Sequence, residues 1–108
     1  MPHIYHIATK KDWLFAIEVG GYTCDSLEKD GFIHCCFESQ IDFVLSEFFN
    51  DRDELVLLKM DPEKIAAKII EENSEGGEEL FPHVYGAINF EAILDAQTLR
   101  RKDRKNDR

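Results

Sequence analysis

Hydrophobic runs alternate with short polar turns along the chain, and three of these runs predict β-strands. Residues 4–7 (IYHI) form a β-favouring stretch, and residues 32–37 (FIHCCF) form another directly after the turn-forming pair Asp30-Gly31. Residues 55–60 (LVLLKM) are apolar almost throughout, which is typical of a strand buried on both faces. The pattern therefore places residues 55–60 in the middle of a sheet.

Two further segments have the periodicity of helices. Thr9 resembles the N-cap of a helix over about residues 10–18. Apolar residues recur every three or four positions from 41 to 49, which predicts a helix with Ser39 as its N-cap. The pair Asp61-Pro62 predicts a short helical turn, because proline is favoured at the first helical position. The apolar face of the first helix is expected to consist of Trp13, Ile17 and either Phe15 or Ala16.

The C-terminal third predicts two more strands, separated by a loop. Residues 68–71 and 93–99 are the expected strands, and Asn89 is placed to cap one helical turn over 90–92. Residues 73–79 (NSEGGEE) form an acidic, glycine-containing loop. This loop is either a lid over a binding site or a plain surface hairpin.

Composition limits both the size and the partners of the protein. The chain has 108 residues, of which 44% are hydrophobic, so it is long enough for one domain and too short for two. Residues 100–108 carry six basic and two acidic side chains, so the net charge of −9 leaves −13 on residues 1–99. We predict a single domain over residues 1–99 and a disordered tail over 100–108. Because an acidic body repels polyanions, no nucleic-acid strand is expected as a partner.

The sequence also argues against a membrane protein. No apolar run approaches the roughly 18 to 20 residues that a membrane-spanning helix needs. The first residues lack the basic and then apolar order of a signal peptide. We therefore expect a cytoplasmic protein without a membrane partner.

The three cysteines, Cys24, Cys35 and Cys36, do not predict a disulfide framework. Their number is odd, two of them are adjacent, and no CxxC pair indicates a zinc site. Neighbouring side chains on a strand point to opposite faces. Cys35 and Cys36 are therefore expected to face one in and one out.

Three of the four histidines lie in apolar or aromatic surroundings, and they are the candidate catalytic residues. His6, His34 and His83 occur in the stretches IYHIA, GFIHCC and LFPHVYG. A buried histidine is costly unless its ring nitrogens find partners, so the three are either separate structural residues or members of one polar pocket. We favour one pocket, which would serve acid and base catalysis, hydroxyl or phosphate recognition, or metal binding.

Other motifs add little specificity to this hypothesis. The histidine spacings match no metal signature, so no metal ligands are assigned, and the glycine pairs fit no phosphate-binding loop. Aromatic residues near the histidine motifs are mostly expected in the core, with Trp13 and Tyr85 as candidate walls of the pocket. Glu79 is either a carboxylate of this pocket or part of a solvated loop. The candidate ligand-binding residues are Thr9, Trp13, Cys36, Glu79 and Tyr85.

Four stretches resemble a small bacterial family catalogued as domain of unknown function 952 (DUF952). They are IYHIATKKDW at 4–13, SLEKDGFIHCC at 26–36, DELVLLKMDP at 53–62 and GEELFPHVYGAINFEAI at 77–93. The resemblance implies an α+β domain similar to the ADP-ribosyltransferase fold, with two small, mostly antiparallel sheets, flanking helices and an NAD-like ligand between the sheets. It does not imply a known reaction.

The resemblance also implies roles for particular residues. In related transferases a polar residue on the first strand, often His, bonds a ribose hydroxyl, and His6 matches that position. Cys36 stands where the family usually has Ser, so one hydroxyl is missing. The glutamate that active transferases use is not assigned here, and Glu79 and Glu91 are only candidates.

Three functions are consistent with these observations. The first is an enzyme or enzyme-like domain with an ADP-ribosyltransferase-like fold, acting on or binding an NAD-like, nucleotide or phosphorylated small ligand. The second is a non-catalytic module that binds a small molecule or a protein and has kept the fold. The third is a metal-dependent hydrolase that uses the same three histidines.

Overall fold

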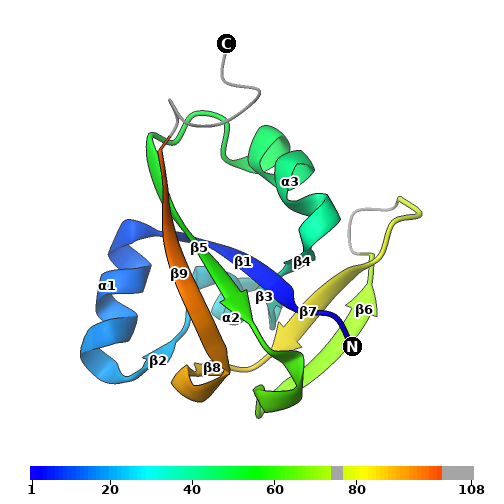
Figure 1. Cartoon of the computed structure of the whole chain (residues 1–108). Coiled ribbons are helices and arrows are strands. Elements are labelled where there is room, and N and C mark those ends of the chain that lie inside the picture. The colour runs from blue at the N-terminus through cyan, green and yellow to red at the C-terminus, as the bar shows by residue number, and fades with distance from the viewer. Residues whose placement is uncertain (74–76, 101–108) are drawn as a thin grey trace.

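The computed structural model describes residues 1–73 and 77–100, which form three small sheets with helices packed around them (Figure 1). Every strand pairing among these residues is antiparallel. The α+β class with small antiparallel sheets is therefore confirmed, with three hydrogen-bonded sheets where the sequence predicted two.

The first sheet has four strands in the order β4-β1-β5-β9. Strand β5 lies between β1 and β9, as its apolar sequence predicted, and Leu55, Leu58 and Met60 on it are completely buried. The two smaller sheets have the orders β2-β8 and β3-β7-β6. The strands are β1 (Ile4–Thr9), β2 (Gly21–Tyr22), β3 (Ile33–His34), β4 (Cys36–Phe37), β5 (Glu54–Met60), β6 (Lys68–Glu72), β7 (Phe81–Tyr85), β8 (Ile88–Asn89) and β9 (Ile93–Arg100).

Three α-helices connect these strands. They are α1 (Lys10–Val19), α2 (Asp25–Asp30) and α3 (Ile41–Phe48), and short 3₁₀ turns span Glu38–Gln40, Pro62–Lys64 and Phe90–Ala92. Thr9 caps α1 as predicted, because its Oγ1 accepts a hydrogen bond from the backbone N–H of Asp12 at 3.1 Å. Asp61 caps its predicted turn in the same way, through the N–H of Glu63. Helix α2 has no counterpart among the elements predicted from the sequence.

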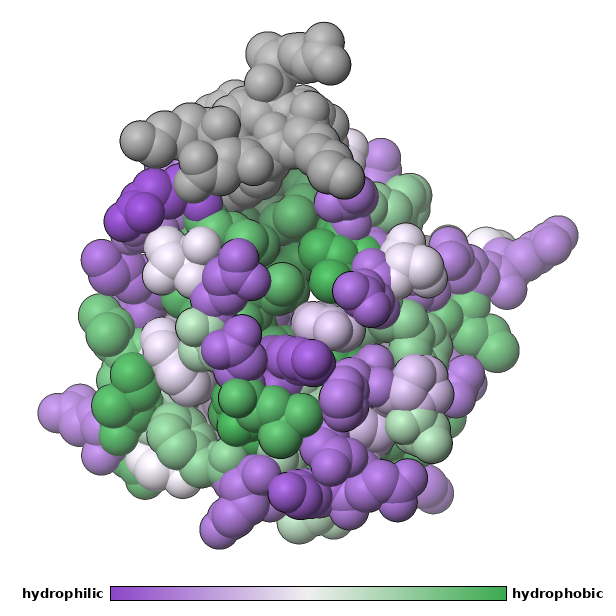
Figure 2. All heavy atoms as spheres, viewed as in Figure 1, coloured by the Kyte–Doolittle hydropathy of each residue, from purple (hydrophilic) through white to green (hydrophobic). Residues whose placement is uncertain are grey.

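The apolar face predicted for α1 is correct at Trp13 and Ala16 and wrong at Ile17. Ala16 is buried and Trp13 is half-buried, but Phe15 and Ile17 are exposed, as are Leu14 and Val19. Figure 2 shows the resulting hydrophobic surface at the left, where α1 lies in Figure 1. Only a narrow apolar stripe of α1 packs against the core, because the helix lies at one end of a small domain and covers only one edge of the core.

The predicted continuous strand over residues 32–37 divides into two strands in different sheets. Strand β3 pairs with β7, whereas β4 pairs with β1, and Cys35 lies between them. The backbone N–H of Cys35 donates to the carbonyl of Pro82. Cys35 and Cys36 are both buried, so the expected alternation of faces is wrong here, because the chain passes from one sheet to another between them.

Two predicted N-caps are replaced by other contacts. Ser39 lies inside the 3₁₀ turn that precedes α3, and the side chain of Gln40 accepts the N–H of Phe37 at 2.8 Å and donates to the carbonyl of Leu80 at 3.0 Å. The helical turn after Asn89 is present, but the amide of Asn89 bonds the backbone of Ala66 and Lys64 instead of capping it. Both side chains thus connect segments that are distant in sequence.

The core consists of two hydrophobic clusters on opposite faces of the four-stranded sheet. The larger one joins all three sheets and contains Ile4, Tyr22, Ile33 and Val84. The smaller one lies between this sheet and α3 and is centred on Ile7, Leu45 and Leu55. The larger cluster is the one that reaches the candidate site.

Strand β9 ends at the first residue of the predicted tail. Arg100 is the last residue of β9, and its guanidinium Nε lies 3.5 Å from Oε2 of Glu54. The rest of the predicted tail and residues 74–76 of the predicted loop lie outside the described residues. In the part of the chain that is described, no helix is long and apolar enough to cross a membrane.

Candidate functional site

His34 and His83 lie side by side on neighbouring strands, and we refer to them as the histidine pair. They are directly opposed in the antiparallel register of β3 and β7, so both side chains leave the same face of the sheet. Their ring centroids are 5.3 Å apart and the rings meet edge to face. The side chain of His83 is 3% exposed and that of His34 is 45% exposed. One imidazole of the pair is therefore covered and the other is open to solvent.

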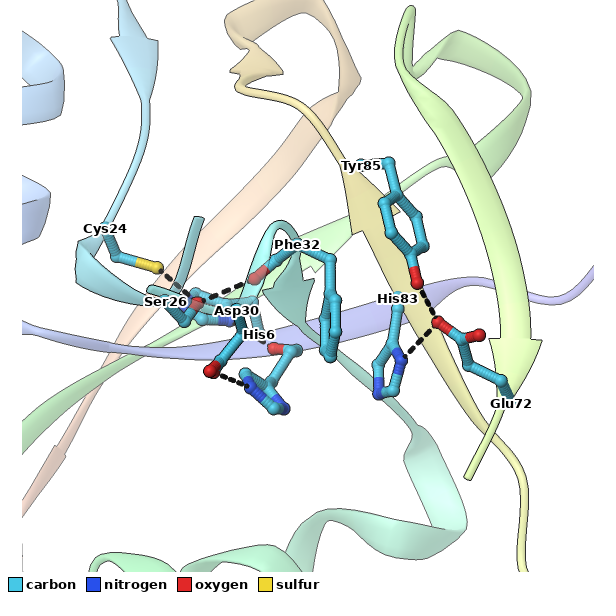
Figure 3. Close-up of polar contacts among 9 residues, drawn as sticks. His6, Cys24, Ser26, Asp30, Phe32, Glu72, His83 and Tyr85 are labelled. Carbon is cyan, nitrogen blue, oxygen red and sulfur yellow. Dashed lines mark hydrogen bonds and ion pairs between the residues drawn. The ribbon is translucent and has the colours of Figure 1, made fainter. Parts of the chain in front are cut away.

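Each imidazole of the pair has a carboxylate on one ring nitrogen. Nε2 of His34 lies 2.9 Å from Asp30, the last residue of α2, and Nδ1 of His83 lies 2.9 Å from Glu72 at the end of β6. Tyr85 donates its hydroxyl to the same oxygen of Glu72 (Figure 3). Hydrogen bonds from Tyr85 and His83 hold the pKa of Glu72 below its usual value, and the bond to Glu72 raises the pKa of Tyr85.

Phe32 forms an aromatic wall beside the pair. Its ring stacks on His83 with centroids 4.0 Å apart and planes 18° from parallel, and it is tilted against His34 and Tyr85. Ser26 donates a hydrogen bond to the carbonyl of Phe32 at 2.9 Å, which fixes the turn that carries this ring. The site is thus a cluster of aromatic rings with two carboxylates at its edge.

His6 lies behind the pair and contacts its backbone. The carbonyl of His34 can only accept, so Nδ1 of His6 donates to it at 2.6 Å, and Nε2 then accepts from the hydroxyl of Tyr22 at 2.7 Å. Burial lowers the pKa of His6 to about 4 and raises that of Tyr22, so both are neutral at pH 7. His6 lies in the four-stranded sheet, Tyr22 in the β2-β8 sheet and His34 in the β3-β7-β6 sheet. His6 therefore lies where the three sheets meet.

One protein-family model matches most of this chain. The model for DUF952, described as a protein of unknown function, matches residues 7–96. The chain belongs to the DUF952 family. No curated protein matches it.

Solved structures with the same fold as this DUF952 domain come from Caulobacter crescentus. The crystal structure of protein CC0527 has a TM-score of 0.80 and 28% sequence identity, and the match covers 90% of this chain and 85% of that one. The crystal structure of a double mutant of CC0527 gives the same values. The solution NMR structure of CC0527 has a TM-score of 0.74 at 28% identity, covering 93% of this chain and 86% of that one.

Three candidate ligand-binding residues of the DUF952 domain have partners outside the histidine pair, and a fourth is buried. Thr9 caps α1, and Trp13 stacks on Phe90 with centroids 5.6 Å apart. Cys36 is buried in β4, where burial raises the pKa of its thiol to about 12. Glu79 accepts a hydrogen bond from Gln40 at 3.1 Å. Their roles toward a ligand stay predictions, whereas Tyr85 lies against Phe32 and Glu72 beside the pair.

Neither carboxylate of the site was predicted from the sequence as a site residue. Asp30 was assigned only to a turn, although a spacing of four residues before His34 is a usable signal. Glu72 is 11 residues before His83 and meets it only because β6 and β7 form a hairpin. Glu79, which was considered either as a pocket carboxylate or as part of a solvated loop, is closer to His83 in sequence but accepts a hydrogen bond from Gln40.

A separate hollow of about 970 Å³ opens beside the N-terminal end of β1. Tyr5, Phe37, Ser39 and Lys59 line it together with residues 1–3 and Glu38, and no member of the histidine pair does so. Within residues 1–73 and 77–100, no group of three or more His, Cys, Asp or Glu side chains is arranged to hold a metal ion. The hypothesis of a metal-dependent hydrolase thus finds no ligand set in this part of the chain.

Proposed function

We propose that this DUF952 domain is an ADP-ribosyltransferase-like domain that binds an NAD-like, nucleotide or phosphorylated small ligand at the histidine pair. The observation that carries the proposal is that His34 and His83 are adjacent and each has a carboxylate on one ring nitrogen. A carboxylate fixes the orientation of an imidazole and leaves its second nitrogen for a ligand. Two such imidazoles on one sheet face form a directed pair of contact points.

The surroundings of the pair suit a ligand with a flat ring. Phe32 and Tyr85 present aromatic surface next to His83, and Tyr85 is 38% exposed. Aromatic rings stack readily on nucleobases and on nicotinamide. The pair and this aromatic surface together match the mixture of polar and apolar groups found in small-molecule sites.

Binding without turnover is the second candidate, and the glutamates favour it. Transfer through an oxocarbenium-like transition state needs a carboxylate free to stabilise positive charge. Glu72 already accepts from His83 and Tyr85, Glu79 accepts from Gln40, and Glu91 accepts from Asn89. A module that kept the pocket and lost the reaction explains why these carboxylates have partners inside the protein.

Calorimetry and thermal unfolding with NAD, ADP-ribose and a panel of nucleotides test the proposal. We expect at least one of these ligands to bind and to raise the melting temperature, and we expect His34→Ala to abolish the effect. His3→Ala is the matched control, because His3 is exposed and lies outside the pair. Absence of binding across the whole panel would contradict the proposal.

Chromatographic analysis of the same mixtures separates the two candidates. Release of nicotinamide from NAD, lost in His34→Ala, identifies an enzyme. Binding without any product identifies the non-catalytic module. Metal analysis of protein purified without a histidine tag excludes the hydrolase if no stoichiometric zinc is found.

A further inference from the structure

The free nitrogens of the histidine pair show which part of a ligand they can contact. Resting on the proposed function, we infer that His34 and His83 accept hydrogen bonds from two hydroxyl groups of an uncharged sugar-type portion of the ligand, and do not hold its phosphates. The inference depends on the proton arrangement at the two rings, on a buried nitrogen without a partner and on the local charge.

The carboxylates dictate where the protons lie. An ionised carboxylate can only accept, so His34 must direct an N–H from Nε2 toward Asp30, and His83 must direct one from Nδ1 toward Glu72. In a neutral imidazole the other nitrogen then carries a lone pair. Nδ1 of His34 and Nε2 of His83 are therefore acceptors, and they need donors from a ligand.

Nε2 of His83 is a buried acceptor in need of a partner. The side chain of His83 is only 3% exposed, and no hydrogen bond reaches Nε2 from any described residue. Buried polar atoms in proteins nearly always have partners, so such an atom indicates a binding position. The ring of His34 lies edge-on to His83, and its contact with Asp30 joins two side chains that are 45% and 47% exposed. The second acceptor, Nδ1 of His34, therefore belongs to the solvent-exposed ring of the pair.

The charge around the pair is unfavourable for a phosphate. Asp30 and Glu72 both lie within hydrogen-bond distance of the rings, and they repel an anion. In the pairing of β6 with β7, the described cation nearest to His83 is Lys68. It is opposite Tyr85, two positions along β7 from His83. A hydroxyl group is uncharged and donates a hydrogen bond. Two hydroxyl groups therefore match the two acceptors without repulsion from the carboxylates.

A metal ion fits the same lone pairs less well than a diol does. Carboxylate-backed imidazoles do bind zinc, but protein zinc sites use at least three protein ligands. The described residues supply only the two imidazoles at this place. Two vicinal hydroxyl groups need only two acceptors.

Two variants remove the acceptors and keep the carboxylate contacts. In His83→Asn the amide nitrogen replaces Nδ1 opposite Glu72, and no atom replaces Nε2. In His34→Gln the amide nitrogen replaces Nε2 opposite Asp30, and no atom replaces Nδ1. His3→Gln is the control for a general effect of losing a histidine. Because His83 is buried, circular dichroism and unfolding measurements must show that His83→Asn is folded. If His83→Asn does not fold, His34→Gln still decides the test, because His34 is exposed.

The probes are adenosine, 2′,3′-dideoxyadenosine and inorganic pyrophosphate, tested by calorimetry in a mildly alkaline buffer. We expect adenosine to bind at least about tenfold more tightly than the dideoxy analogue, because the analogue leaves both acceptors unpaired. Each variant should weaken adenosine binding by roughly three- to tenfold and leave the analogue unchanged. Pyrophosphate should not compete with adenosine.

The outcomes distinguish this inference from the proposed function. If NAD or ADP-ribose binds but the two nucleosides bind equally, or if pyrophosphate displaces adenosine, the diol inference is wrong and the proposed function stands. Stoichiometric zinc that depends on His34 and His83 also overturns the inference. If neither NAD, ADP-ribose nor adenosine binds, the proposed function and the inference both fail.

Discussion

Nδ1 of His6 donates a hydrogen bond to the backbone carbonyl of His34 across 28 residues of sequence, at 2.6 Å. This contact joins the four-stranded sheet to the sheet that carries the histidine pair. The position that the family resemblance relates to ligand binding thus already has both ring nitrogens occupied inside the protein. A ligand can reach His6 only by replacing one of these partners.

The first prediction concerns the stability that His6 supplies. His6→Leu substitutes an apolar side chain of similar size and removes the imidazole that contacts the carbonyl of His34 and the hydroxyl of Tyr22. We expect a loss of about 2 to 4 kcal/mol in the free energy of unfolding, measured with urea. Tyr22→Phe should cost less, about 1 to 2 kcal/mol, because it leaves only Nε2 of His6 without its hydrogen-bond partner. Equal stability of His6→Leu and wild type would contradict this role.

The second prediction concerns the effect of acid. The pKa of His6 falls from 6.5 to about 4 on folding, so between these values the unfolded chain binds more protons than the folded one. This contribution to stability is therefore complete above about pH 6.5 and is lost as the pH falls toward 4, by roughly 3 kcal/mol. The stability gap between wild type and His6→Leu should shrink over this range in urea titrations. A gap independent of pH would show that His6 is not buried in its neutral form.

The third prediction concerns Glu72, which contacts both His83 and Tyr85. The hydrogen bond to Glu72 is the largest cause of the raised pKa of Tyr85. Glu72→Gln removes the negative charge, so we expect the pKa of the Tyr85 phenol to move down toward its ordinary value of about 10. Ultraviolet titration, with Tyr85→Phe identifying the signal, measures this shift. Glu71→Gln, an exposed neighbour on the same strand, should leave the titration unchanged.

The fourth prediction concerns the close approach of Gly86 to Ala67. A Cβ atom on Gly86 would lie 2.8 Å from Cβ of Ala67, which is too short for two carbon atoms. Gly86→Ala should therefore destabilise the protein by about 1 to 3 kcal/mol in thermal or urea unfolding. The double variant Gly86→Ala with Ala67→Gly restores the space and should recover most of the loss. If the double variant is no more stable than Gly86→Ala, another cause must be sought.

Local sequence signals predicted most of the elements correctly. Strand β1, the cap at Thr9, the central strand β5 and the turn started by Asp61 all follow from contacts within a few residues. At the two predicted N-caps that are absent, a distant partner was the reason. Gln40 and Asn89 bond segments far along the chain, and the sequence around them contains no trace of these partners.

The sequence by itself determined the α+β class, the family and the three histidine motifs, because hydrophobic periodicity, turn residues and motif order are local properties of the chain. Only the tertiary structure decided that His34 and His83 form a pair while His6 lies behind them with both nitrogens bonded. It also decided that Asp30 and Glu72, rather than Glu79, are the carboxylates of the pair. The physical reason is that these contacts depend on the β3–β7 register and on which sheets meet, and both are set by packing between segments distant in sequence.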